Sequence, residues 1–73
     1  MTCLGLCGDC NQDGLGPTVV DALVAARIAA GLAMAVGQQQ YCCDVDSSGA
    51  IDVLDALGMA QVAAGLPVTL TCP

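Results

Sequence analysis

Seven aspartates are the residues of this chain whose type and spacing could do chemistry, and they form two groups. In the second group, carboxylates, a hydroxyl and a glycine follow the order Asp44-x-Asp46-x-Ser48-Gly49-x-x-Asp52-x-x-Asp55. Oxygen ligands at loop positions 1, 3, 5, 9 and 12, with glycine at position 6, are typical of a calcium loop. The Ala50 carbonyl would supply position 7, and Asp55 would close the shell.

The first group has the same front half and a longer back half. Asp9, Asn11 and Asp13 stand at positions 1, 3 and 5, and Leu15 at position 7 offers a carbonyl. Asp21 then stands at position 13 instead of 12, because the loop holds one extra residue. We expect this loop to bind calcium as well, with a stretched geometry.

Electrostatics favours ions at both loops. The net charge is −6 and the chain has one Lys or Arg in total, Arg27, so the clustered carboxylates would repel one another. Two calcium ions would reduce the net charge to −2. Magnesium fits less well because it retains its waters, and the alternative without an ion is that the aspartates form Asx-turns and helix caps.

The chain contains an internal repeat. Residues 19–32 and 53–66 share nine of 14 positions. Thr18 and Asp52 can cap helices that Gly31 and Gly65 would end, so we predict helices near 19–30 and 53–64. Residues 32–36 could add a short helix, and both chain ends should be extended or irregular. The predicted organisation is one domain, 1–73, with repeat one at 8–32, a connector at 33–42, repeat two at 43–66 and a tail at 67–73.

This duplicated loop–helix pattern resembles a type I dockerin domain, a relative of the EF-hand. The resemblance implies an all-α fold in which two antiparallel calcium loop–helix repeats are related by a pseudo-two-fold axis. It also implies docking onto a cohesin module. The ligands that it implies are Asp9, Asn11, Asp13, the Leu15 carbonyl and Asp21, then Asp44, Asp46, Ser48, the Ala50 carbonyl, Asp52 and Asp55.

Six cysteines in so short a chain favour disulfides and an oxidising, extracellular or cell-surface location. The alternatives are a zinc or iron–sulfur site on the four sulfurs of Cys7, Cys10, Cys42 and Cys43, and a thiol redox or zinc module at residues 7–10. Chain ends lie close together in dockerins, so the expected pairing is Cys3–Cys72, with Cys7 and Cys10 bridging to Cys42 and Cys43. A disulfide between subunits is the alternative to this pairing.

The amino-acid composition excludes several classes of function. A chain with no His and no Lys offers no Ser–His or Cys–His pair and no basic surface for nucleic acid, and its helical stretches are too short to insert in a membrane. We expect no enzymatic activity. The predicted helices are apolar almost all round, which favours burial against other molecules over simple exposure of alanine. We therefore expect a structural subunit that self-associates into a filament or array, with cohesin docking as the alternative.

Overall fold

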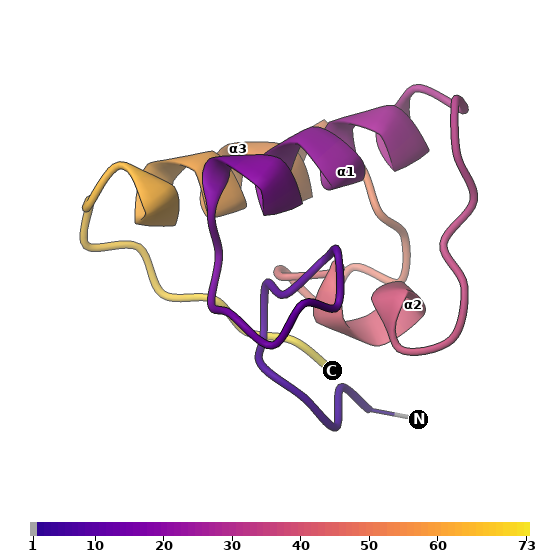
Figure 1. Cartoon of the computed structure of the whole chain (residues 1–73), viewed down its shortest axis with the longest axis horizontal. Helices are drawn as coiled ribbons and strands as arrows, with labels where there is room; N and C mark the ends of the chain where they lie inside the picture. The colour runs from indigo at the N-terminus through magenta and orange to yellow at the C-terminus, as the bar shows by residue number, and fades with distance from the viewer. Residues whose placement is uncertain (1) are drawn as a thin grey trace.

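Two helices of equal length form one layer of the structure. The computed structural model describes residues 2–73 and has three helices, α1 (Val19–Ala29), α2 (Gln39–Cys42) and α3 (Val53–Ala63). Helices α1 and α3 pack against each other and run in opposite directions, while the loops, α2 and both chain ends lie beneath them (Figure 1). No strand forms within the described residues, so the predicted all-helical class is confirmed at this level.

The ends of α1 and α3 follow from their capping residues. Asp52 caps α3, its side chain accepting a hydrogen bond from the amide of Leu54. Gly31 and Gly65 follow the helices with positive φ angles of 79° and 86°, which glycine adopts without steric cost. The helices predicted over 19–30 and 53–64 are thus present, each ending one residue earlier than expected.

The short helix expected at 32–36 is wrong. Those residues are not helical, and the short helix α2 lies instead at Gln39–Cys42. Leu32, Met34 and Val36 are all largely exposed, so the segment has no buried apolar face that would stabilise a helix. Helix α2 has such an anchor, because Cys42 is completely buried.

The core between the two layers is small and rich in sulfur. Its fully buried side chains include Met59, Ala25, Cys10 and Cys43, with Val45 almost as deeply buried. No phenylalanine or tryptophan contributes to it. A chain of this length buries a modest share of its surface, so covalent links carry part of its stability.

Three disulfides link the two ends of the chain to its middle. They join Cys3 to Cys42, Cys7 to Cys72 and Cys10 to Cys43, and no cysteine is left free in residues 2–73. The pairing indicates an oxidising, extracellular-type environment.

The expected disulfide pairing is correct only for Cys10–Cys43. The two chain ends do meet, because the amide of Cys3 donates a hydrogen bond to the Pro73 carbonyl. Successive side chains of extended backbone point to opposite sides. With Pro73 opposite Cys3, the neighbouring Cys72 faces Cys7 instead, and Cys3 pairs with Cys42.

Replacing both Cys7 and Cys72 by serine should destabilise the fold most among the three double replacements. Their disulfide spans 65 residues, against 39 and 33 for the others. A loop of that length contributes about 4 kcal/mol by restricting the unfolded chain. Urea denaturation in calcium measures the loss. A smaller loss than for the matched Cys10→Ser and Cys43→Ser variant would contradict the expectation.

Candidate metal centre

The first aspartate cluster joins loop one to the start of α1. Carboxylate oxygens of Asp9, Asp13 and Asp21 lie within 4.8 Å of one another. Asp21 is completely buried and Asp9 nearly so, whereas Asp13 is exposed. The cluster therefore has a buried floor and one side open to solvent.

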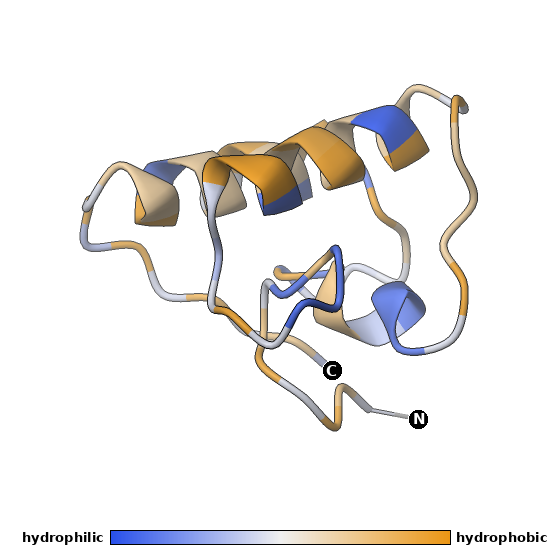
Figure 2. Ribbon diagram, viewed as in Figure 1, coloured by the Kyte–Doolittle hydropathy of each residue, from blue (hydrophilic) through white to orange (hydrophobic). Residues whose placement is uncertain are grey.

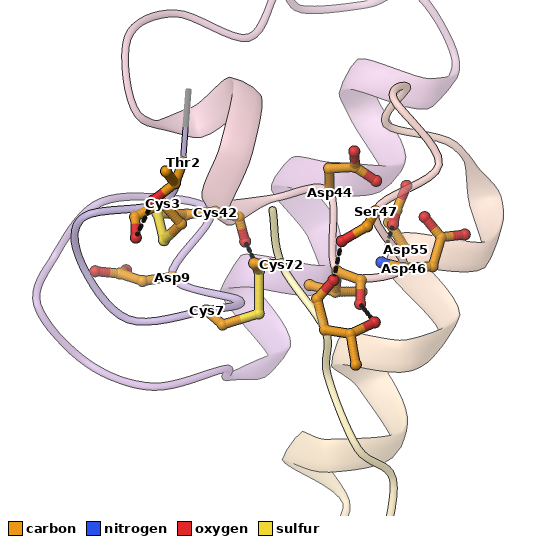
Figure 3. The surroundings of a disulfide bond; sticks show 12 residues. Thr2, Cys3, Cys7, Asp9, Cys42, Asp44, Asp46, Ser47, Asp55 and Cys72 are labelled. Carbon is orange, nitrogen blue, oxygen red and sulfur yellow. Dashed lines mark hydrogen bonds between the residues drawn. A yellow bond between two sulfur atoms is a disulfide. The ribbon is translucent and has the colours of Figure 1, made fainter.

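The second cluster has the same composition at the start of α3. Oxygens of Asp44, Asp46 and Asp55 also lie within 4.8 Å of one another. Asp55 and Asp44 are buried and Asp46 is exposed. These three side chains gather to one side of the Cys7–Cys72 disulfide (Figure 3).

The first aspartate of each loop folds the loop around itself. Asp9 accepts hydrogen bonds from the amides of Asp13, at 3.1 Å, and Gly14, at 2.9 Å. Asp44 accepts the corresponding bonds from Ser48, at 3.1 Å, and Gly49, at 2.9 Å. These bonds turn the amides toward the carboxylate and curl each loop into a short arc.

Each arc requires backbone conformations that few residues adopt. Gly14 and Gly49 have φ angles of 85° and 91°, and nothing lies within 4 Å of where a side chain would begin. A larger residue would therefore be penalised at these positions by backbone strain rather than by a clash. Gln12 and Ser47 also have positive φ angles, of 59° and 56°.

The helix aspartates fix each loop to the helix that follows it. Asp21 accepts hydrogen bonds from the amides of Asn11, at 3.0 Å, and Thr18, at 2.8 Å. Asp55 likewise accepts from Asp46, at 3.3 Å, and Asp52, at 2.8 Å. A carboxylate in the first helical turn is also stabilised by the helix dipole. The loop and the helix are thus positioned by the same buried group.

The other predicted ligands lie around the clusters. The Asn11 side chain contacts Asp13 in loop one. The Ser48 hydroxyl donates a hydrogen bond to the Ala50 carbonyl, so these two predicted ligands are adjacent. Asp52 caps α3 rather than joining the second cluster. Leu15 is exposed and its amide donates a hydrogen bond to Asp13.

Burial and like charges perturb the ionisation of the second cluster. The pKa of Asp55 is raised to about 6, chiefly by burial. The amide of Asp52 opposes this rise, and the charges of Asp46 and Asp44 contribute to it. The Ser48 hydroxyl lowers the pKa of Asp46, and the Leu15 amide lowers that of Asp13. Asp55 is therefore the carboxylate that most needs a positive partner when it ionises.

Without metal ions, the protein should become less stable as the pH rises from about 4 to about 6. The pKa of Asp55 is near 6 in the fold and 3.8 in an unfolded chain, so folding favours its protonated form. The stability from this group is complete below pH 3.8 and is lost as the pH passes 6. The lowered pKa values of Asp13 and Asp46 act oppositely, below pH 4.

Urea denaturation of metal-free protein across this pH range tests the prediction. The Asp55→Asn variant is the control, because its side chain does not titrate and its stability should change less over the same range. A wild-type stability that rises between pH 4 and 6 would contradict the assignment of this titration to Asp55.

The donor set of both clusters fits a hard divalent cation. Each cluster offers three carboxylates, all of which accept hydrogen bonds from backbone amides, next to carbonyl and hydroxyl or amide oxygens. The one basic side chain, Arg27, lies in the last turn of α1, at the far end of that helix from Asp21. No side chain among residues 2–73 therefore provides a positive charge at the first cluster.

Two features of the surroundings were not predicted from the sequence. The C-terminal tail holds loop two, since the Thr71 amide donates to the Val45 carbonyl at 2.7 Å and the Ser47 hydroxyl donates to the Thr71 carbonyl. A cavity of about 450 Å³ also opens beside loop two, with Tyr41 and Ile51 in its wall. Neither feature has a local sequence pattern, because each brings together segments that are distant along the chain.

Comparison with protein-family models, curated proteins and solved structures gives no match to this chain. Among the described residues, no helix has the length and apolar character needed to cross a membrane.

Proposed function

We propose that this protein is a non-enzymatic, calcium-binding assembly module of the extracellular space or cell surface, with a duplicated, dockerin-like architecture. The observation that carries the proposal is the pair of three-aspartate clusters. Each combines a loop carboxylate, an exposed carboxylate and a buried helix carboxylate. Bringing such groups together is costly unless a cation balances them.

Calcium is the favoured ion because of its coordination chemistry. It takes six to eight oxygen ligands in a flexible shell, whereas magnesium demands a near-ideal octahedron and keeps its waters. No cysteine within residues 2–73 is free to bind zinc as a thiolate, since all six form disulfides. Calcium would balance the carboxylates that the fold brings together, so binding would be coupled to stability.

Two pairs of equivalent bonds support the dockerin-like relation. The bond from Gly14 to Asp9 recurs from Gly49 to Asp44, and the bond from Thr18 to Asp21 recurs from Asp52 to Asp55. In the proposed architecture, a pseudo-two-fold axis relates these two loop–helix units, as in the EF-hand-related domains that the sequence resembles.

Self-association is the favoured mode of assembly because large apolar side chains remain exposed. Val19, Leu23, Val53 and Leu57 are each more than half exposed on the two long helices. Such patches mark interaction surfaces. Repeated contacts between copies would build a filament or array. The second candidate is docking onto a cohesin-like receptor, which the calcium-loop spacing favours.

Calorimetric titration of calcium into metal-free, oxidised protein tests the metal assignment. The expected stoichiometry is two ions per chain. Asp9→Ala and Asp44→Ala should each reduce it to one, because each removes the first ligand of one loop, while Arg27→Ala should leave it at two. A wild-type protein that takes up no calcium at millimolar concentration would refute the assignment.

A further inference from the structure

We propose that the outer surface of the α1–α3 layer is a two-fold contact between two copies of this chain. The inference rests on the self-association proposed above and specifies one contact of it. Because a two-fold contact closes at two copies, growth into a filament or array needs a second, different contact. We call this surface the outer helix face. Its large side chains are Val19, Val20 and Leu23 of α1 and Val53, Leu54 and Leu57 of α3.

Helical periodicity places Leu23, Leu57 and the first valine of each helix away from the rest of the molecule. Val20 and Leu54, each one residue before a buried aspartate, lie at the edge of the face. Asp21 and Asp55 are completely buried and bond to the loops, so they mark the inner side of each helix. Leu23 and Leu57 lie two residues further on, about 200° around the helix. The loops, α2 and chain ends lie on the inner side of the layer (Figure 1). Leu23 and Leu57 are each more than half exposed, as outward-pointing side chains on the opposite side should be.

The size of the side chains varies along each helix in a way that matches a second copy. The first half of α1 carries valine and leucine on this face, and its second half carries Ala26, which is exposed. Helix α3 repeats the order and ends with Ala60. The helices run in opposite directions (Figure 1), so the valine at the start of each helix lies toward the alanine-bearing end of the other. Leu23 and Leu57, each the fifth of eleven residues, both lie near the middle.

A second copy can be placed against this face by a half-turn rotation. The rotation axis lies in the plane of the face and runs parallel to the helices. Helix α1 of each copy then lies over α3 of the other. The valines at the helix starts of one copy lie over the alanine-bearing helix ends of its partner, and the central leucines of the two copies meet. Such a face is complementary to itself, as a two-fold interface requires. Alanine also allows helices to approach closely.

The charge distribution favours this contact between two like-charged chains. All seven carboxylates lie in the loops or at the starts of the helices, so hydrophilic residues concentrate below the layer (Figure 2). Two copies with charge −6 repel least when they meet through the face that has no carboxylate at its centre. In the register described, Arg27 of the second copy approaches Asp52 at the start of α3.

The exposed apolar area approaches that of a standard dimer interface. Six large apolar side chains, each more than half exposed, make a patch of several hundred Å² per chain. The flanking alanines and the ends of the helices extend it toward the roughly 800 Å² per partner of a standard interface.

Sedimentation of oxidised, calcium-loaded protein over a range of concentrations tests the inference. The decisive variant combines Ala26→Leu with Ala60→Leu. It makes the face more apolar, yet it should raise the dimer dissociation constant at least about tenfold because leucine fills the space that the partner's large residues occupy. Ala33→Leu, at an exposed alanine outside the helices, is the matched control and should leave dimerisation unchanged.

A second variant guards against misfolding. Leu23→Gln with Leu57→Gln should also weaken the dimer, and calorimetry should still find two calcium ions in each variant. An Ala26→Leu and Ala60→Leu variant that associates as tightly as wild type, or more tightly, would overturn the inference. A calcium-loaded wild type that stays monomeric would also overturn the inference. The metal assignment would stand in that case, because it is refuted only if the protein takes up no calcium.

Discussion

Removing calcium is expected to lower the melting temperature of the oxidised protein by roughly 20 °C or more. An ion at a thousand times its dissociation constant stabilises the folded state by about 4 kcal/mol, and two sites would add. The stabilisation is large here because four of the aspartates are buried in the fold. Without the ions, these groups repel one another or must take up protons.

Differential scanning calorimetry in millimolar calcium and in excess chelator measures this difference. Magnesium at the same ionic strength is the control, since it screens the carboxylates equally but should restore much less of the melting temperature. Equal melting temperatures in calcium and in chelator would contradict the proposed role of the ions.

Asp55→Ala should destabilise the calcium-loaded protein far more than Arg27→Ala. The alanine removes the buried ligand of the second cluster, which would cost about 4 kcal/mol of calcium stabilisation. It also removes the acceptor for the amides of Asp46 and Asp52, at about 1 kcal/mol each. Arg27 is exposed at the end of α1, so its replacement should change stability by less than about 0.5 kcal/mol.

Urea denaturation of both variants, in calcium and in chelator, separates the two contributions. The calcium-dependent part of the Asp55→Ala loss should disappear in chelator, where the cost of the lost hydrogen bonds is offset by removal of a buried charge that is repelled by Asp44 and Asp46. Asp44→Ala should behave in the same way at the other side of the cluster. Equal stabilities of Asp55→Ala and Arg27→Ala in calcium would contradict the assignment of Asp55 as a ligand.

The helices could be predicted from the sequence because their limits depend on local chemistry. Asp52 at the start of α3 and glycines at 31 and 65 act on amides and carbonyls only a few residues away. The two acidic clusters could also be predicted from the sequence, since each lies within a single loop and the first turn of the next helix. The bound ion itself remains a prediction.

The disulfide pairing could not be predicted because it depends on contacts between distant segments. Whether Cys72 meets Cys3 or Cys7 is decided by the side of the tail on which its side chain lies. That side is set by bonds from Cys3 to Pro73 and from Thr71 to Val45. The short helix was misplaced for a related reason, since the buried Cys42 anchors α2 through its bond to Cys3.

Sedimentation velocity of the oxidised chain in millimolar calcium and again in excess chelator is the most direct test of the account. A calcium-dependent assembly module should form dimers or larger species in calcium that dissociate or unfold in chelator. The same compact monomer of about 7 kDa in both conditions would contradict it.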